Sequence, residues 1–255
     1  MQYDFYKYHG AGNDFIIIDN RKFFFDKKNK SYIENICNRR TGVGADGLIL
    51  LENDSNGDFK MVYFNADGNE STMCGNGGRC IVAFAKKMNI INKETSFEAI
   101  DGLHYATIDD KNNVNLQMKD IDIIENTYTD FVLDTGSPHY VKVVDEFTKD
   151  FVELARNIRN SKRFKKEGIN VNFIKVNENK VTIRTFERGV EDETLACGTG
   201  CVAAAISVME INKTTKDIHL NAKGGELKVS ATKDKKGYKN IWLYGPTAFV
   251  FKGTL

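Results

Sequence analysis

The chain contains two copies of one unusual arrangement, a cysteine placed directly before a glycine-rich turn that leads into an apolar segment. The copies are MCGNGGRC at residues 73–80, followed by IVAFA, and ACGTGC at residues 196–201, followed by VAAAI. This layout puts Cys74 and Cys197 at helix N-termini, where unpaired N–H groups and the helix dipole can hold an anion and can lower a thiol pKa from its usual ~8.5. Because the copies are so alike, we interpret them as a duplicated half-site.

Length and composition are typical of a globular protein with two domains. The 255 residues are 41% apolar and 28% charged, and the formal net charge is +1. Acidic and basic residues are mixed along the chain, which argues against a nucleic-acid-binding or membrane-surface protein. We therefore expect a small-molecule partner, and the sequence leaves a homodimer open.

The first residues and the cysteine content favour a cytoplasmic protein. The opening MQYDF carries an early acid and lacks the basic and apolar regions of a signal peptide. No apolar run approaches the ~20 residues that span a bilayer. Five cysteines, an odd number, read as free thiols in a reducing compartment rather than as a disulfide framework.

Each half has the same predicted order of elements: strands around a glycine-rich polar turn, a helix, a hairpin, the cysteine-capped helix and an antiparallel meander. The helix that precedes the hairpin is predicted over residues 31–40 in the first half, with Ser31 as its N-cap, and over residues 148–160 in the second. Strand signals weaken in the acidic segment 120–130, so we place the domain boundary there.

Both cysteine-capped helices are apolar nearly all round, which predicts that each is the buried central helix of its half. If strands wrap each helix, the two N-termini can face one another across the domain interface. Two opposed thiols suit the removal of a proton from one face of a carbon and the delivery of a proton to the other face. The glycine turns would bind the substrate carboxylate and stabilise charge that develops there. The predicted reaction is inversion at an α-carbon without a cofactor.

The remaining cysteines have a plainer interpretation. Cys37, Cys80 and Cys201 read as buried core residues. A metal site is not predicted, because the sequence has no Cys-x-x-Cys pair and Cys197 with Cys201 lacks a companion pair of ligands. His139 lies in a candidate site loop, and we expect it to act in the site rather than only in a turn.

A set of motifs runs in order along nearly the whole chain. It comprises HGAGNDF at residues 9–15, FNADG at 64–68, MCGNGGRC at 73–80, GSPH at 136–139, NVNF at 170–173, ERG at 187–189 and ACGTG at 196–200. Together these motifs resemble the diaminopimelate epimerase family. The resemblance implies a two-base epimerase without a cofactor, which interconverts LL-2,6-diaminoheptanedioate and its meso form in lysine and peptidoglycan precursor synthesis.

The resemblance also implies the fold, an α/β fold of two pseudosymmetric halves. Each half is a mainly antiparallel sheet or open barrel around a central helix, and the last strand returns to the first half. The expected domains are residues 1–119 plus 248–255, which carry Cys74, and residues 120–247, which carry Cys197.

Roles for individual residues follow from the same resemblance. Cys74 would be the proton donor and Cys197 the acceptor. The reacting carboxylate would be held by Gly75, Asn76, Gly198 and Thr199, and the substrate, chiefly its distal amino-acid end, by Asn13, Asn65, Asn170, Glu187 and Arg188. The thiols or the substrate would be oriented by His139, Glu187 and Ser137.

Two positions depart from the commonest pattern of the family. Gly47 stands where many members carry a substrate-contacting Gln, and Ser137 where many carry Asn. Ser137 can still form a hydrogen bond, whereas Gly47 cannot replace a side-chain contact. Two alternatives stay open: another two-thiol amino-acid racemase or epimerase of the same fold, which would lack the distal clamp, and a non-catalytic binding member, which would not need both cysteines.

Overall fold

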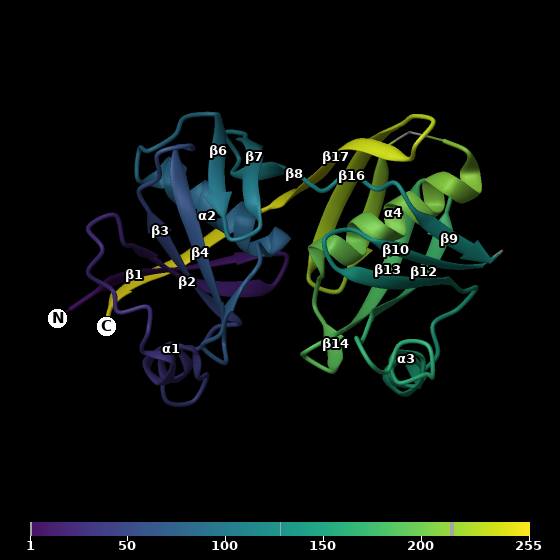
Figure 1. The fold of residues 1–255 in the computed structure, drawn as a ribbon, viewed down its shortest axis with the longest axis horizontal. Coiled ribbons are helices and arrows are strands. Elements are labelled where there is room, and N and C mark those ends of the chain that lie inside the picture. Colours follow the sequence, from purple (N-terminus) through teal and green to yellow (C-terminus); the bar gives the residue numbers. More distant parts are fainter. Residues whose placement is uncertain (1, 128, 215–216) are drawn as a thin grey trace. The chain divides into compact units, whose positions relative to one another are not determined.

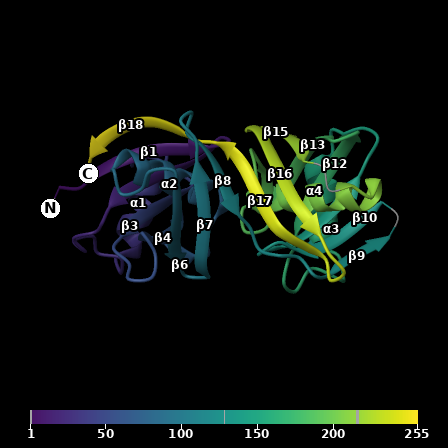
Figure 2. The ribbon, with the colours of Figure 1, turned by 90° about the horizontal axis from the view of Figure 1, so that it is seen from above.

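A computed structural model describes residues 2–127, 129–214 and 217–255 of the protein (Figure 1). Residues 1, 128 and 215–216 lie outside the described part, so the acidic segment 120–130 is described except for residue 128. The chain divides into two compact units, Met1–Leu116 with Gly245–Leu255, and Gln117–Tyr244. We call them unit 1 and unit 2, and Figure 2 shows the elements of each from a second direction.

Unit 1 is a mixed sheet with one central helix. Its elements are β1 (Asp4–Gly10), β2 (Asn13–Asp19), α1 (Lys30–Cys37), β3 (Gly47–Glu52), β4 (Phe59–Asn65), β5 (Glu70–Ser71), α2 (Gly75–Lys87), β6 (Glu94–Ala99), β7 (Gly102–Ile108), β8 (Asn113–Gln117) and β18 (Ala248–Thr254). β1 pairs antiparallel with β18 and β2, and β2 runs parallel to β3. β3 and β4 are antiparallel, β4 and β6 are parallel, and β6, β7 and β8 form a meander.

The two helices of unit 1 lie on opposite faces of its strands. α2 is buried from Gly75 to Ala85 and contacts β1, β2, β3, β4 and β7. α1 covers the other face, where Ile33, Ile36 and Cys37 pack with Ile16, Leu48 and Phe64. Because both faces are covered, β2 and β3 read as nearly continuous apolar runs in the sequence.

Unit 2 has the same kind of architecture. Its elements are β9 (Ile124–Thr127), β10 (Asp130–Asp134), β11 (Pro138–Val143), α3 (Phe151–Arg159), β12 (Asn170–Asn177), β13 (Lys180–Glu187), β14 (Asp192–Thr194), α4 (Gly198–Asn212), β15 (Ile218–Ala222), β16 (Gly225–Lys233) and β17 (Tyr238–Pro246). α4 is almost entirely buried and contacts strands β10 to β13, β15 and β16. α3 packs through Phe151 and Ala155 on Phe173 and Phe186.

From β10 onward, unit 2 repeats the order and pairing of unit 1. The parallel pair β11–β12 corresponds to β2–β3, and the parallel pair β13–β15 corresponds to β4–β6. A short strand and a cysteine-capped helix follow in both units, and a meander closes each. The predicted fold class, two α/β halves that each wrap a central helix, is confirmed. The predicted burial of Cys37, Cys80 and Cys201 is confirmed as well.

The prediction for the start of the first helix was wrong. α1 spans Lys30–Cys37 rather than residues 31–40. Its N-cap is Asn29 and not Ser31, because Asn29 Oδ1 accepts a hydrogen bond from the Tyr32 N–H at 3.1 Å.

Two predictions in unit 2 also need correction. α3 spans Phe151–Arg159 and is shorter than the predicted residues 148–160. The acidic segment 120–130, for which strand signals were weak, contains β9, and this strand pairs antiparallel with β10. Most of β9 is exposed, so its sequence lacks the apolar alternation that reveals a half-buried strand.

Candidate active site

Cys74 is the N-cap residue of α2 and has extended backbone angles (φ −88°, ψ 127°). Its carbonyl accepts a hydrogen bond from the Gly78 N–H at 2.6 Å, which closes the first helical turn. A Cβ atom at Gly77 would lie 3.1–3.4 Å from side chains of β2, β3 and β4. Glycine therefore lets this turn pack closely against the sheet, and the predicted helix start after Cys74 is confirmed.

The side-chain amide of Asn13, at the start of β2, links Cys74 to the rest of unit 1. Asn13 Oδ1 accepts hydrogen bonds from Cys74 Sγ at 3.7 Å and from Asn76 Nδ2 at 3.1 Å. Asn13 Nδ2 donates to Asp46 Oδ2 at 2.5 Å. These contacts fix the orientation of the amide, so an acceptor oxygen faces the Cys74 thiol.

A network of ion pairs behind Asn13 holds Asp46 in place. Arg39 bridges Asp14 at 2.6 Å and Asp46 at 2.7 Å, and Lys7 pairs with Asp14 at 2.7 Å. Burial acts to raise the pKa of Asp14, but hydrogen bonds from Arg39 and Lys7 outweigh it and lower the pKa to about 2. Asp14 therefore stays ionised near neutral pH.

Sequence reasoning assigned no role to Arg79, which is fully buried on α2. Its guanidinium donates to the Gly75 carbonyl at 3.1 Å and to Asn76 Oδ1 at 2.9 Å. The second bond orients the Asn76 amide so that its nitrogen points at Asn13. The available signal was an arginine inside an apolar helix, since a charge is buried in such a place only when it is hydrogen-bonded or paired.

Asn65 ends β4 and lies directly opposite Gly47 in the β3–β4 register. A Cβ atom at position 47 would lie 2.5 Å from the Phe64 carbonyl oxygen and 2.6 Å from Tyr63 Cε2. The ring of Tyr63 thus fills the space beside Asn65 that a side chain at position 47 would need.

Cys197 is the N-cap residue of α4 (φ −116°, ψ 117°) and is 8% exposed. Its Sγ lies 3.3 Å from Thr199 Oγ1, and its carbonyl accepts the Cys201 N–H at 2.9 Å. A Cβ atom at Gly200 would lie 2.6 Å from Asn172 Oδ1. Glycine is required there because a polar side chain packs directly beneath the turn.

Buried polar side chains form a chain of hydrogen bonds beneath Thr199. His139 Nε2 lies 2.9 Å from Thr199 Oγ1, and His139 Nδ1 lies 3.0 Å from Asn172 Nδ2. The amide of Asn172 is oriented by Thr185, whose hydroxyl donates to Oδ1 at 2.9 Å, and by the Tyr140 carbonyl, which accepts from Nδ2 at 3.1 Å. Asn172 Nδ2 therefore donates to His139 Nδ1, and the imidazole proton resides on Nε2.

The position of this proton decides how Thr199 is used. Burial lowers the pKa of His139 to about 3, so its imidazole is neutral and donates through Nε2 to Thr199 Oγ1. The Thr199 hydroxyl can then give its own proton to Cys197 Sγ. A hydrogen-bond donor thus faces Cys197, whereas an acceptor faces Cys74.

The pKa of Cys197 differs from the expectation for a thiol at a helix N-terminus. Burial raises it well above its usual value, and the negative charge of Glu187 acts in the same direction. Hydrogen bonds from Thr199 and from the Gly200 N–H lower it, but they do not outweigh burial. The expected lowering was therefore wrong for Cys197, and its thiolate is a correspondingly stronger base.

A second cluster in unit 2 joins Asn170, Ser137 and Arg188. Asn170 Nδ2 donates to Ser137 Oγ at 2.8 Å and to the Pro138 carbonyl at 3.0 Å, while its Oδ1 accepts the Arg188 N–H at 2.9 Å. Asn170 is buried, whereas Arg188 is exposed and donates from its guanidinium to the Glu167 carbonyl at 3.0 Å. Ser137 thus keeps a hydrogen bond at its atypical position.

The half-sites occupy equivalent places in the repeated topology, but their supports differ in polarity. By strand register, Phe15, Ile49 and Tyr63 beneath α2 correspond to His139, Asn172 and Thr185 beneath α4. Glycines on the two helices contact equivalent members of these sets, Gly77 in unit 1 and Gly200 in unit 2. An apolar layer therefore supports the Cys74 helix, and a polar, hydrogen-bonded layer supports the Cys197 helix.

Comparison with known proteins agrees with these motifs. A family profile described as Diaminopimelate epimerase matches residues 5–123 and 131–250. The chain belongs to the diaminopimelate epimerase family. A family member named Diaminopimelate epimerase, from Flavobacterium psychrophilum, is 52% identical and aligns over 98% of this chain and 99% of its own length. A second relative named Diaminopimelate epimerase, from Chlorobaculum tepidum, is 41% identical and aligns over 96% of this chain and 98% of its own length.

Solved structures outside the family share its fold. A phenazine biosynthesis protein of the PhzF family from Bacillus anthracis has a TM-score of 0.80 at 13% identity, covering 100% of this chain and 99% of that one. A hydroxyproline epimerase from Agrobacterium vitis, with bound trans-4-OH-L-proline, has a TM-score of 0.69 at 14% identity. The alignment covers 100% of this chain and 92% of that one. At these identities the likeness concerns the fold alone.

The described residues can be compared with the side-chain clusters that hold metal ions and with the helices that span membranes. Among them, no group of three or more His, Cys, Asp or Glu side chains is placed to hold a metal ion. Over the same ranges, the helices are all too short or too polar to cross a bilayer. All five cysteines lie in the described part of the chain, and each is a thiol rather than half of a disulfide.

Proposed function

We propose that this chain is a diaminopimelate epimerase, which interconverts LL-2,6-diaminoheptanedioate and meso-diaminoheptanedioate without a cofactor. The observation that carries the proposal is a cysteine at the N-cap of the buried central helix in each of two repeated units, in a member of this family. The names of full-length relatives at 52% and 41% identity support the substrate. The reaction belongs to the synthesis of lysine and peptidoglycan precursors.

The opposite polarity of the two half-sites supports opposite roles for the thiols. Cys74 gives a proton to the α-carbon, since its thiol faces the acceptor Asn13 Oδ1. Cys197 takes the α-proton as a thiolate, since the Thr199 hydroxyl and the Gly200 N–H stabilise negative charge on its sulfur. The roles exchange in the reverse reaction, so each half supplies one base: residues 1–119 plus 248–255, and residues 120–247.

The first turns of α2 and α4 suit the reacting carboxylate. Gly75, Asn76, Gly198 and Thr199 form the first turns of α2 and α4, and the N–H groups and the dipole at a helix N-terminus bind anions. Negative charge moves toward the carboxylate as the α-proton leaves, and donors held in place stabilise that charge.

The distal end of the substrate carries an ammonium and a second carboxylate, and we assign it to Asn65, Asn170, Glu187 and Arg188. The Arg188 guanidinium is exposed and suits bidentate contact with a carboxylate, while Glu187 suits the ammonium. Asn170 contributes by accepting the Arg188 N–H and by bonding to Ser137. His139 acts through Thr199 rather than on the substrate.

The test is exchange of the α-proton in deuterated water, with LL-diaminopimelate as substrate. We expect exchange and inversion in the wild type and loss of inversion in Cys74→Ser and in Cys197→Ser. Cys80→Ala, which alters a buried thiol on α2, is the matched control and should keep inversion. If either serine variant inverts at the normal rate, the two-base assignment fails.

The same assay separates the alternatives. Exchange with proline or hydroxyproline, but not with diaminopimelate, would identify another racemase of this fold. The absence of exchange with every amino acid tried would point to a non-catalytic binding protein.

We further propose that the protein is a homodimer. β18 carries three consecutive apolar residues that are 44%, 52% and 43% exposed, Phe249, Val250 and Phe251. Exposed apolar side chains on a strand mark interaction sites, and a second copy of the chain would cover those of Val250 and Phe251. Light scattering after gel filtration should give a dimer for the wild type and a monomer for Val250→Asp, and a monomeric wild type would overturn the proposal.

We propose the cytoplasm as the compartment, which the reduced state of all five cysteines supports. Fractionation of cells that express the protein with a C-terminal tag should recover it with cytoplasmic markers. Recovery in an extracytoplasmic fraction would contradict this assignment.

A further inference from the structure

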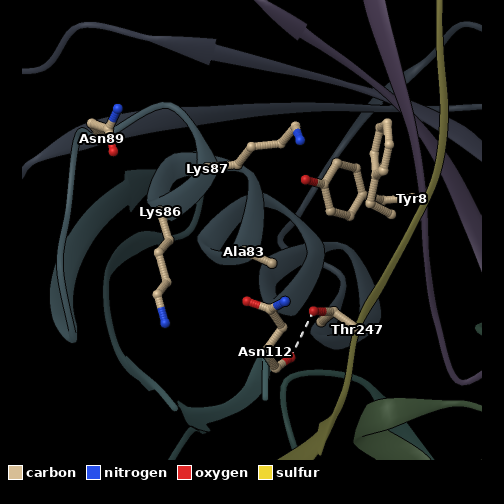
Figure 3. A pocket seen from close by; sticks show the side chains of 8 residues that line it. Tyr8, Ala83, Lys86, Lys87, Asn89, Asn112 and Thr247 are labelled. Atoms are coloured by element: carbon tan, nitrogen blue, oxygen red, sulfur yellow. Dashed lines mark hydrogen bonds between the residues drawn. The ribbon is translucent and has the colours of Figure 1, made fainter. Parts of the chain in front are cut away.

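We propose that a pocket at the C-terminal end of α2 is a second binding site, for a small molecule that carries a carboxylate or phosphate group. The pocket has a volume of about 360 Å³, which is within the range of small-molecule sites. It is lined mainly by Tyr8, Lys86, Lys87, Asn112, Thr247 and Phe249 (Figure 3). All of these residues belong to unit 1, and the opposite end of the same helix carries Cys74.

The charge of the lining points to an anion. Lys86 and Lys87 face the pocket, and the lining contains no carboxylate among the described residues. Lys86 donates to the Asp109 carbonyl at 2.8 Å, and its 3.6 Å pair with Asp110 is weak because the Asp110 side chain is 88% exposed. The Lys87 ammonium lies 4.5 Å from the centre of the Phe249 ring, so an aromatic face and not an acid is its neighbour in the pocket.

Tyr8 provides an independent observation. It is only 3% exposed, yet its hydroxyl points into the pocket toward α2 (Figure 3). This hydroxyl makes no hydrogen bond to any described residue. Burial raises the pKa of Tyr8 well above its usual value, so the phenol stays neutral and can donate. The side chain is buried but its hydroxyl opens onto the pocket, where a bound anion would accept its hydrogen bond.

The remaining walls fit an organic anion rather than a bare ion. Phe249 and Ala83 provide apolar surface, and the polar residues Asn89 and Asn112 also line the pocket. The Thr247 hydroxyl donates to the Asn112 carbonyl at 2.8 Å, which ties the entry of β18 to the β7–β8 turn and shapes this side of the pocket. The anionic group would lie between the Lys87 ammonium and the Tyr8 hydroxyl, which point toward one another in Figure 3, with the carbon part of the ligand against the Phe249 ring.

The test is isothermal titration calorimetry of the full-length protein with succinate, with inorganic phosphate and with chloride as the reference anion. We expect saturable binding of succinate or phosphate, and the tighter of the two identifies carboxylate or phosphate as the recognised group. Lys87→Gln should bind it about tenfold more weakly, and Tyr8→Phe should weaken it in the same direction. Lys111→Gln removes an equal charge from an exposed residue close by that does not line the pocket, and it should bind like the wild type.

Three results would overturn the proposal: no saturable binding by the wild type, equal affinity in Lys87→Gln, or equal losses in Lys87→Gln and Lys111→Gln. Binding that disappears in Cys74→Ser but persists in Lys87→Gln would place the anion at the N-terminus of α2 and would also refute it. None of these readouts depends on epimerase activity, so the site and the proposed reaction stand or fall separately.

Discussion

The ring of Tyr63 lies over Gly47, so a Cβ atom at position 47 would come within 2.6 Å of Cε2 and 3.2 Å of the hydroxyl oxygen. Tyr63 is 8% exposed and meets Phe15 edge to face, with ring centroids 5.9 Å apart. The ring cannot leave this position without losing that contact. The tyrosine at position 63 therefore requires glycine at position 47, because its ring occupies the space that a larger side chain would need.

We predict that Gly47→Ala lowers the free energy of unfolding by about 1–3 kcal/mol, the usual cost of overpacking. The Phe64 carbonyl, at 2.5 Å, belongs to the β3–β4 ladder and cannot retreat as a flexible side chain could. Urea denaturation measures the change. Gly47→Gln should be at least as destabilised and should not lower the KM for diaminopimelate. An unchanged unfolding midpoint in Gly47→Ala would contradict the prediction, because it would show that β3 and β4 can move apart to accept a side chain at low cost.

Thr199→Val tests the hydrogen bond to Cys197. Valine removes the hydroxyl that faces Cys197 Sγ, and a hydrogen bond to a charged group is worth enough to change kcat/KM by about tenfold or more. Because this bond lowers the pKa of Cys197, its loss should also shift the rise of activity to higher pH. Thr199→Ser keeps a hydroxyl, so its kcat/KM and the pH at which its activity rises should both be close to those of the wild type. Equal pH–activity profiles for Thr199→Val and Thr199→Ser would contradict the role of the hydroxyl.

Asp14→Asn tests the ion network behind Asn13. The pKa of Asp14 falls from 3.8 to about 2 on folding, so its ionisation stabilises the protein above pH 3.8 and this stability is lost as the pH falls through 2. We expect Asp14→Asn to be less stable than the wild type by up to about 2 kcal/mol at pH 7, with the difference shrinking below pH 4. Denaturation at a series of pH values measures it, and a difference that grows on acidification would reverse the assigned sign.

Oxidation tests whether the two thiols share one substrate carbon, as the two-base proposal requires. With diamide as oxidant and no reductant, we expect a Cys74–Cys197 disulfide and loss of activity, both reversed by dithiothreitol. Peptide mapping by mass spectrometry identifies the crosslink, and Cys37→Ala serves as the control that should still form it. Full activity after oxidation, with no such crosslink, would argue against the shared site.

The parts of the site that local sequence reveals are the cysteine-capped helices, because cysteine, glycine turn and apolar run are adjacent along the chain. The N-cap of α1 was predicted wrongly as Ser31, since Asn29 and Ser31 are both good capping residues and only the backbone path selects between them. Arg79 and Asn172 were missed as structural supports because they act through the orientation of other side chains. The raised pKa of Cys197 depends on burial by distant segments, which a local motif does not report.

The contrast between the layers beneath α2 and α4 has a consequence for the two directions of the reaction. If one sulfur is supported by Phe15, Ile49 and Tyr63 and the other by His139, Asn172 and Thr185, the duplicated scaffold gives the two bases different proton affinities. The forward and reverse reactions then cross unequal barriers at the two proton transfers. Primary deuterium isotope effects should accordingly differ in size between the LL and meso substrates. The α-proton of each substrate is then removed by a base of different strength.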